Sequence, residues 1–343
     1  MKSERPRYLP TPRQLLAWGM AVLGMLCVLS VMAFWIGHAN AKTPGDTINY
    51  ILAGLRLNVG HPLYGYGPGD QHIKVFELGP DYPIYSPPLI AIIFRAVVLL
   101  PSNGMYIWWV AMDALELLAV GMLLRRAPLV VGICLIPLSI PVGMVMEVAN
   151  VDCLVVFGML FAWLWLRDGR DGRAALVIAA VASLKLTPVI FVWWLWVTGR
   201  RKAAAIAIAG GIVLALVAML GSEPLVFLKF YQVTTANLDD PISWFGPVGI
   251  ARALGAPEIV LAWLPRVILV GGVAAIWLLR KRPGLSFAIA AAMMWLASPV
   301  AVLHTPALIL VAFAPLAWPM ARDATPVTDV APVTTPAAEP AAG

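Results

Sequence analysis

The chain has 343 residues, of which 61% are hydrophobic and only 12% are charged. Soluble domains carry about a quarter charged residues, so this composition excludes a water-soluble globular protein and indicates a membrane protein. The formal net charge of +6 does not indicate a nucleic-acid partner. The Lys and Arg residues fall in short clusters between apolar runs, and this placement is typical of membrane topology.

The first predicted element is a membrane anchor. A basic tail, residues 1–14, precedes an apolar run from Leu15 to Ile36. This run has the length of about 20 residues that a helix needs to span the hydrocarbon core. Ala39-Asn40-Ala41 is similar to a signal-peptide cleavage site. The run is longer than a signal core, however, so we expect an uncleaved anchor.

A hydrophilic stretch, residues 38–86, follows the anchor and is predicted to lie outside the membrane. Near its start, Asp46 occupies a predicted helix N-cap position. Apolar residues then recur at helical spacing, which predicts an amphipathic helix on the membrane surface: Ile48, Ile51, Leu52, Leu55 and Val59. Asp46 is either only a helix cap or also a general base, and these two roles are compatible.

The stretch closes with Tyr82-Pro83-Ile84-Tyr85-Ser86-Pro87-Pro88. Its prolines enforce an extended backbone just before the next apolar run. The tyrosines either line a groove for a lipid or sugar or belong to the aromatic belt that is common at membrane interfaces.

The rest of the chain alternates apolar segments with basic clusters. The apolar segments are residues 89–100, 105–124, 127–146, 151–166, 174–198, 203–221, 258–279, 285–297 and 299–320. The basic clusters are predicted to be cytoplasmic: Arg125-Arg126, Arg167 to Arg173, Arg200-Arg201-Lys202 and Arg280-Lys281-Arg282. Residues 321–343, rich in Pro, Ala and Thr, are expected to be a disordered tail.

Two segments do not fit a simple series of crossings. Residues 174–198 have basic flanks at both ends, so we expect two short helices that enter and return, with Lys185 and Pro188 at the tip. Residues 89–100 dip in from the outer side and return, unless one basic cluster is misplaced. Together the segments predict an all-α polytopic membrane protein with about 10–11 membrane helices, some of them short or re-entrant.

Charged residues inside apolar sequence cost about 2.5–3.5 kcal/mol each at a helix centre, so those present need an explanation. Lys185 either holds a lipid phosphate as a point charge or extends to the lipid headgroups. Arg95, Asp113 and Glu116 are expected to pair with one another as structural groups.

Polar residues also gather at two predicted outer turns. Glu147, Asn150 and Asp152 offer a second carboxylate near Asp46, or are ordinary loop residues. His304 lies at the other turn, where a lone histidine is more often a structural hydrogen-bonding group. The spacings match neither a metal site nor a nucleotide-binding loop, so we expect no metal or other cofactor and a donor that arrives as a lipid phosphate. The cysteines are expected to be buried free thiols: Cys27, Cys134 and Cys153.

In chain order, these motifs resemble glycosyltransferase family 87. This family comprises GT-C-fold membrane enzymes, typified by polyprenyl-phosphate-mannose-dependent mannosyltransferases of actinobacteria. The matching motifs are Asp46 with Tyr50, Gly60, Leu63 and Tyr64, then Tyr85-Ser86-Pro87-Pro88, then Lys185-Leu186-Thr187-Pro188, and finally Ser298-Pro299 followed by His304. The chain departs from the family at Ala149-Asn150-Val151-Asp152, where Gly-Gln-x-Asn is usual, and at Thr305, where an aromatic residue is frequent.

The resemblance implies a GT-C catalytic domain over residues 15–320, with outer loops at 38–86 and 221–257. The protein would lie in the plasma (inner) membrane with a cytoplasmic N-terminus and an active site that faces outside. It would transfer mannose, with inversion, from polyprenyl-phosphate mannose to a lipid-linked glycan such as a phosphatidylinositol mannoside or a lipoglycan. Asp46 would be the general base, and the substrate-binding residues would be Lys185, His304, Tyr50, Tyr64, Tyr85, Asn150 and Asp152.

Three alternatives stay open at this point. An arabinofuranosyl donor would use the same fold. A lipid or sugar transporter also carries intramembrane charges and broken helices. An accessory protein that only binds a lipid-linked precursor would tolerate neutralisation of Asp46.

Overall fold

A computed structural model describes residues 10–38, 45–64, 86–236, 245–298 and 301–320, and the regular elements among them are all helical. The α-helices are α1 (Pro12–His38), α2 (Gly45–Asn58), α3 (Pro88–Val97), α4 (Met105–Arg126), α5 (Pro128–Glu147), α6 (Asp152–Arg167), α7 (Asp171–Leu184), α8 (Ile190–Val197), α9 (Arg201–Gly221), α10 (Val226–Ala236), α11 (Pro247–Ala253), α12 (Glu258–Leu278), α13 (Pro283–Leu296) and α14 (Ala314–Ala317). The 3-10 segments are η1 (Pro101–Gly104), η2 (Thr187–Val189) and η4 (Thr305–Phe313).

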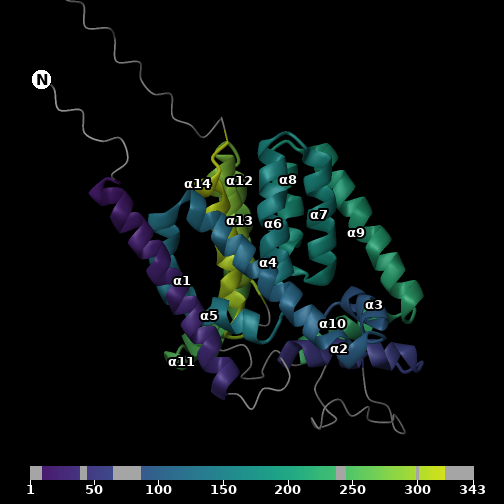
Figure 1. The fold of residues 1–343 in the computed structure, drawn as a ribbon. Coiled ribbons are helices and arrows are strands. Elements are labelled where there is room, and N and C mark those ends of the chain that lie inside the picture. Colours follow the sequence, from purple (N-terminus) through teal and green to yellow (C-terminus); the bar gives the residue numbers. More distant parts are fainter. Residues whose placement is uncertain (1–9, 39–44, 65–85, 237–244, 299–300, 321–343) are drawn as a thin grey trace, which may run out of the picture.

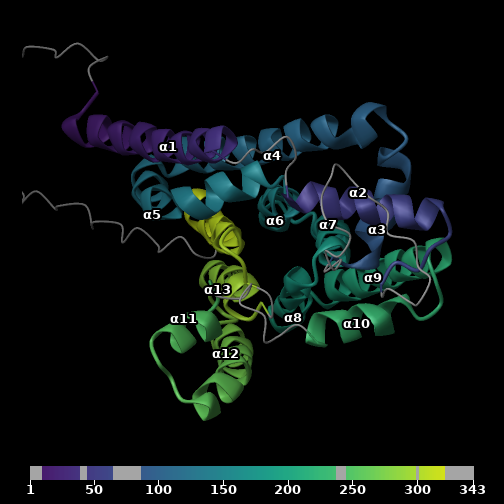
Figure 2. The same ribbon diagram turned by 90° about the horizontal axis from the view of Figure 1, so that it is seen from below.

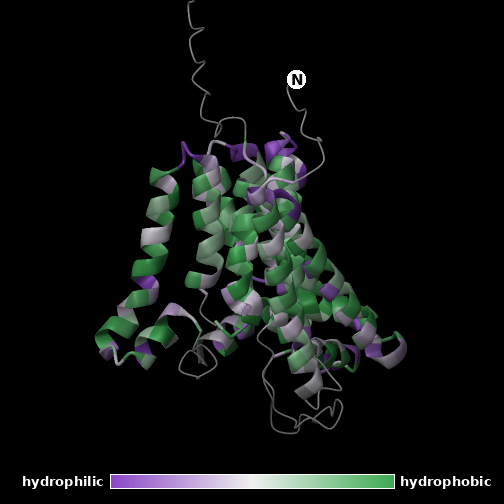
Figure 3. Ribbon diagram, turned by 60° about the vertical axis from the view of Figure 1, so that its left-hand side comes forward, coloured by the Kyte–Doolittle hydropathy of each residue, from purple (hydrophilic) through white to green (hydrophobic). Residues whose placement is uncertain are grey.

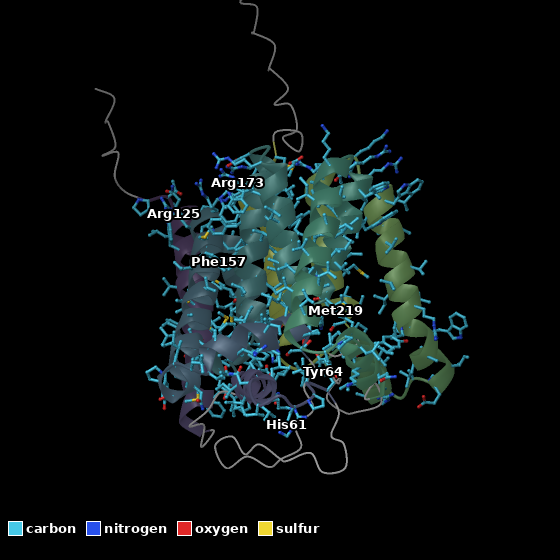
Figure 4. The ribbon with its side chains drawn as sticks, turned by 90° about the vertical axis from the view of Figure 1, so that its right-hand side faces the viewer. His61, Tyr64, Arg125, Phe157, Arg173 and Met219 are labelled. Carbon is cyan, nitrogen blue, oxygen red and sulfur yellow. The ribbon has the colours of Figure 1, made fainter. Side chains whose placement is uncertain are left out.

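The long helices run side by side between two chemically different ends (Figure 1). Figure 4 shows Arg125 and Arg173 at one end, His61 and Tyr64 at the other, and Phe157 and Met219 between them. We call the first the basic end, because all four basic clusters lie there. We call the second the site end, where α2, α3, α10 and α11 lie across the ends of the long helices, as the view from that side shows (Figure 2).

Five of the described helices are long and apolar enough to cross a membrane: Pro12–Trp35, Pro101–Arg126, Pro128–Glu147, Arg201–Gly221 and Glu258–Leu278. Shorter apolar helices fill the spaces between them, and Figure 3 shows hydrophobic residues along the shafts and hydrophilic residues at the basic end. Many large apolar side chains face outward, as expected against lipid. The prediction of an all-α polytopic membrane protein is confirmed.

Glycines allow α1 to lie directly against α5. A Cβ atom on Gly132 would come within 2.6 Å of the backbone of Met20, and one on Gly24 would come equally close to the carbonyl oxygen of Gly132. Small residues permit this close approach of two helix backbones in a membrane. The contact fixes α5, whose last residue, Glu147, leads into the turn at the site end.

The chain folds back on itself between α7 and α8. Lys185 is extended, with φ −145° and ψ 126°, and follows the last residue of α7 directly. Pro188 explains the break, because its nitrogen has no hydrogen for the carbonyl of Leu184 and its ring would collide with that group in a continuous helix. The predicted hairpin is confirmed, with both outer ends at the basic end and Lys185 at the tip (Figure 1).

Helix α3 follows its predicted path only in part. It has 10 residues, lies at the site end and is followed by η1, where Ser102 and Asn103 both have a φ of 53°. This tight turn reverses the chain into α4, which leads to the basic end (Figure 1). Residues 89–100 therefore begin and end at the site end, and α3 lies across that end instead of dipping into the bundle.

Helix α2 confirms the predicted helix after the anchor but is more deeply buried than a surface helix. Ile48, Ile51 and Leu52 are buried as expected, whereas Val59 lies beyond the helix and is 59% exposed. The prediction of a surface helix missed the extent of this burial, because α3 covers α2 along much of its length. The helix begins at Gly45, so Asp46 lies in its first turn rather than at the N-cap.

The three cysteines are free, as predicted, but only Cys153 is fully buried. Cys27 and Cys134 are half-buried. They lie on α1 and α5, two helices on the lipid-facing side of the bundle.

Candidate active site

Four separate elements bring polar side chains together at the site end. Asp46 comes from the first turn of α2, and Asn150 and Asp152 from the turn between α5 and α6. Lys185 comes from the tip of the hairpin, and His304 from the residue that precedes η4. Up to 258 positions separate these residues along the chain, and the fold joins them in one cluster through the contacts described below.

Asp46 is held by two neighbours and is partly open to solvent. Its Oδ2 accepts a hydrogen bond of 2.7 Å from Nδ2 of Asn150 and lies 3.6 Å from Nε2 of His304. Its side chain is 29% exposed. The carboxylate is therefore oriented by the protein and still accessible to a substrate.

Asp152 is in a different situation. Its side chain is fully buried, and both of its oxygens contact Nζ of Lys185, at 2.5 and 2.7 Å. Lys185 itself is 19% exposed. A buried carboxylate of this kind needs its cation, because an unpaired charge there is costly. Asp152 therefore fixes the position of the Lys185 ammonium group.

The turn between α5 and α6 has a strained backbone. Ala149 has a φ of 47°, a left-handed conformation that favours glycine. The turn is tied on one side by the Asn150 side chain, whose Oδ1 accepts a 2.8 Å hydrogen bond from the backbone N–H of Asp152. The strain is tolerated because neighbouring side chains hold the turn in place.

Three of these neighbours were not identified from the sequence. Trp108 donates its indole N–H to the carbonyl of Ala149 at 2.9 Å, and Trp109 donates to the carbonyl of Met146 at 3.1 Å. Buried Thr47, beside Asp46, reaches the carbonyl of Val148 at 3.5 Å. In the sequence, two adjacent tryptophans indicate only the aromatic belt that is common at membrane interfaces. Their hydrogen bonds to this turn could not be predicted from that pattern.

His304 is 7% exposed and faces charged groups from three elements. Burial lowers the pKa of its imidazole, and Lys185 lowers it further, while Asp46 and Asp152 oppose this change. Burial is the largest of these effects. The ring is therefore neutral at neutral pH in the unliganded protein.

The predicted tyrosines have different positions. Tyr50 is buried, accepts a 3.3 Å hydrogen bond from the N–H of Val151, and has a pKa raised by burial and by Asp46. Tyr64 is buried at the opposite end of α2 and donates its hydroxyl hydrogen to the carbonyl of Ser86. Tyr85 lies outside the described residues. The structure therefore brings Tyr50, but not Tyr64, close to the polar cluster.

The expected mutual pairing of Arg95, Asp113 and Glu116 is wrong. Arg95 bonds to Oδ1 of Asn58 at 3.1 Å and to the carbonyl of Gly221 at 3.0 Å. Both carboxylate oxygens of Glu116 and one of Asp113 are buried without a hydrogen-bond partner. Arg95 lies on α3 at the site end, and its contacts to α2 and α9 keep it away from the acidic residues of α4.

An apolar cavity of about 540 Å³ lies next to the hairpin tip. Its walls come from α3, α7, α8, α9 and α10 and include Ser183 and Leu186, which flank Lys185 in sequence. The cavity therefore offers an apolar space close to a fixed ammonium group. Among the described residues, no group of three His, Cys, Asp or Glu side chains is arranged to hold a metal ion.

The model of glycosyltransferase family 87 matches residues 84–299, more than half of the chain. The chain belongs to glycosyltransferase family 87. It is a multi-pass membrane glycosyltransferase of the GT-C type. Neither a curated protein nor a solved structure matches the chain.

The range that matches the family model covers only part of the polar cluster. The matched range includes Asn150, Asp152 and Lys185, and it excludes Asp46 and His304. The resemblance implied a glycine at position 149, where the chain has alanine. The positive φ of Ala149 is a conformation that glycine adopts more readily, so it gives a physical reason for that expectation.

Proposed function

We propose that this glycosyltransferase moves a mannosyl residue from polyprenyl-phosphate mannose to a lipid-linked glycan acceptor, such as a phosphatidylinositol mannoside or a lipoglycan. Asp46 is the general base of an inverting transfer. The observation that supports this proposal best is the cluster in which an oriented, accessible carboxylate lies beside a fixed ammonium group and a histidine.

The two aspartates differ in how well they suit a base. Asp152 has both oxygens engaged by Lys185 and is fully buried, so it is poorly placed to accept a proton from a substrate. Asp46 is partly exposed and is held by an amide N–H, which orients the carboxylate without neutralising it. A general base needs both orientation and access to the proton that it removes.

In the proposed reaction, a hydroxyl oxygen of the acceptor attacks the anomeric carbon of the donor sugar. Asp46 takes the hydroxyl proton as the new carbon–oxygen bond forms. The bond between the anomeric carbon and the phosphate oxygen breaks on the opposite face, and its electron pair stays with the polyprenyl phosphate. The configuration at the anomeric carbon is inverted.

The leaving phosphate needs positive charge or hydrogen-bond donors as its negative charge grows. In this proposal, Lys185 and His304 supply the positive charge and the hydrogen-bond donors. Both side chains lie close to Asp46, which is the base. The apolar cavity beside the hairpin tip accommodates the first isoprene units of the lipid chain. Tyr50 positions the turn that carries Asn150 and Asp152. Tyr64 and Tyr85 are further proposed substrate-binding residues, and Tyr85 lies outside the described residues.

The proposal also covers the membrane in which the enzyme lies and the lipids that it binds. The four basic clusters support a cytoplasmic basic end, which leaves the site end facing outside the plasma (inner) membrane. Donor and acceptor are both membrane lipids, and the enzyme reaches them from within the bilayer. We propose that the reaction requires no metal ion.

The test uses the full chain reconstituted in lipid vesicles with polyprenyl-phosphate mannose and phosphatidylinositol mannoside acceptors. Products are measured by mass spectrometry of the lipids. We expect Asp46→Asn to reduce transfer by at least about a hundredfold, because loss of a general base typically costs 10²–10⁴ in rate. Chelation of divalent metals should leave the wild-type rate unchanged.

The matched control is Asp168→Asn, which makes the same chemical change at the basic end, where Asp168 pairs with its neighbour Arg167 at 2.9 Å and with no other described side chain. This variant should retain the wild-type rate. Transfer by Asp46→Asn at the wild-type rate would refute the assigned base. Transfer from a polyprenyl-phosphate arabinose donor, with none from the mannose donor, would change the sugar and leave the base intact.

A further inference from the structure

Two arginines at the site end make no hydrogen bond or ion pair to another element among the described residues, and both line the same cavity. The other described Lys and Arg side chains there are engaged: Arg56 with the carbonyl of Pro62, Arg95 with Asn58, Lys185 with Asp152, and Lys229 with Glu223. Arg252, in the last turn of α11, makes no hydrogen bond or ion pair among the described residues. Arg266 donates only to a carbonyl of its own helix, that of Ala262, at 2.7 Å.

Both arginines line one cavity of about 460 Å³ between α11, α12 and the end of α13. Glu258, in the first turn of α12, lines it as well. Hydrogen bonds fix the wall near Phe245, whose N–H donates to the carbonyl of Ala301 at 3.1 Å and whose carbonyl accepts from the indole of Trp295 at 3.0 Å. The cavity is therefore a defined part of the fold, and its lining residues differ from those of the polar cluster around Asp46.

The side chain of Arg266 points toward the site end. Its bond to Ala262 lies one turn back along α12, and its guanidinium carbon lies 5.4 Å from the ring centroid of Trp263. Arg266 is about 12 Å from the start of α12, at 1.5 Å per residue. A long arginine side chain at such a depth can extend along the helix and reach the lipid headgroups with its charged end.

Positive charge at this end runs against the topology of the chain. The positive-inside rule accounts for the arginines of the basic end, but it gives no reason for Arg252 and Arg266 at the opposite end. Guanidinium groups bind phosphate oxygens with two parallel N–H groups. Glu258 makes the cavity less positive, and its carboxylate accepts hydrogen bonds from hydroxyl groups.

We propose that this cavity binds the headgroup of a membrane phospholipid, with Arg252 and Arg266 on the phosphate and Glu258 on headgroup hydroxyls. The ligand is thus a phosphodiester that carries a polyol, as in phosphatidylglycerol. Ala301 in the cavity wall is three residues from His304, so a bound lipid would lie next to the transfer site. Two sources share this chemistry, namely bulk phospholipid and the glycosyl acceptor itself.

The binding test does not depend on the transfer reaction. The full chain is released from phosphatidylcholine nanodiscs that contain phosphatidylglycerol, and retained lipids are counted by native mass spectrometry. We expect the double variant Arg252→Gln/Arg266→Gln to bind phosphatidylglycerol about tenfold more weakly than wild type. Diacylglycerol, which has no phosphate, should bind equally to both proteins.

Two further variants distinguish a specific binding site from a general attraction between the positive charge of the protein and the anionic lipid. Arg280→Gln/Lys281→Gln removes two cations from the turn that follows α12 at the basic end and should leave this binding intact. Arg252→Lys/Arg266→Lys keeps the charge, so it should bind with intermediate affinity and reports whether the arginine positions still fold normally. Unchanged binding in the double glutamine variant, or an equal loss in both charge-removing variants, would overturn the proposal.

A second arm, which rests on the proposed function, identifies the source. If the acceptor supplies the phosphate, the double glutamine variant should show a raised KM for a phosphatidylinositol mannoside acceptor with an unchanged kcat. If bulk phospholipid supplies it, that KM should equal the wild-type value. A protein without transferase activity would still give the nanodisc result, so the two proposals fail separately.

Discussion

His304 is the residue whose charge the rest of the site determines most directly. Asp46 and Asp152 lie 3.6 and 4.0 Å from its Nε2 and favour the protonated ring, yet burial outweighs them and lowers the pKa. The site without substrate therefore holds one fixed ammonium group, Lys185, and one neutral imidazole. A bound phosphate changes this balance, because its negative charge lies beside the ring.

Donor binding is therefore expected to take up a proton. The bound phosphodiester raises the pKa of His304, so protons bind over the pH range between the lower pKa of the free protein and the higher pKa of the complex. The donor should therefore bind more tightly as pH falls through that range, by up to about tenfold per pH unit. The measurement is the Kd of polyprenyl-phosphate mannose without acceptor, from about pH 8 to about pH 6.

The control for this prediction is His304→Gln, which keeps a polar side chain that does not titrate. Its Kd should be nearly independent of pH over the same range. The phosphodiester of the donor does not titrate there either, so an equal pH dependence in both proteins would mean that another group takes up the proton.

At the scale of elements, the contact between α2 and α3 determines where Asp46 lies. A Cβ atom on Gly54 would come within 2.6 Å of the backbone carbon and oxygen of Phe94, so only glycine allows this approach. Tyr50, one turn after Asp46, also contacts Phe94, with ring centroids 5.4 Å apart. The base is thus positioned by helix packing several residues away from it.

Gly54→Ala should therefore reduce both stability and transfer. The added methyl group forces the helices apart at a cost of about 1–3 kcal/mol. A displacement of Asp46 by about 1 Å is expected to slow transfer by up to about a hundredfold. Melting temperature in detergent and the transfer rate in vesicles are the two measurements.

Gly121→Ala on α4 is the matched control, because no atom lies within 4 Å of the position of its Cβ. This substitution should leave the rate unchanged and slightly favour the helix. If the two variants behaved alike, the close approach of α2 and α3 would not position the base.

The elements themselves were largely predictable from the sequence. Apolar run length located the long helices, and the basic flanks of residues 174–198 together with Pro188 predicted the hairpin. The burial of α2 was not predictable, because helical periodicity shows which residues face apolar surroundings but not whether lipid or protein supplies them. The pairing of Lys185 with Asp152, rather than with headgroups, also depends on a contact across 33 positions.

Across the whole molecule, the sequence indicated which polar residues lie at the same end but not which of them touch. Asp46 was predicted in the outer hydrophilic stretch and His304 at an outer turn, so their shared end follows from topology alone. Lys185 was predicted at the tip of a hairpin that enters from the basic side, and the sequence did not place it beside them. The strained Ala149 and its tryptophan contacts were not predictable, because they depend on side-chain positions that periodicity does not specify. The cavity with Arg252 and Arg266 was missed for the same reason.

The orientation of the whole bundle gives a final prediction. If the basic end is cytoplasmic, a reagent that cannot cross the membrane should reach only the site end. Val59 is 59% exposed at the site end, and Asp168 is exposed at the basic end. We therefore expect Val59→Cys to react with an impermeant maleimide in intact cells and Asp168→Cys to react only after permeabilisation, in a background whose own cysteines are replaced by alanine.

The opposite labelling pattern would place the polar cluster on the cytoplasmic side. The transfer chemistry would be unaffected, because the cluster is built by contacts within the chain and not by the membrane. The source of the sugar would change, however, since the donor lipid would then be used in the leaflet that faces the cytoplasm. The labelling result thus separates the orientation of the enzyme from its mechanism, which the Asp46→Asn variant tests independently.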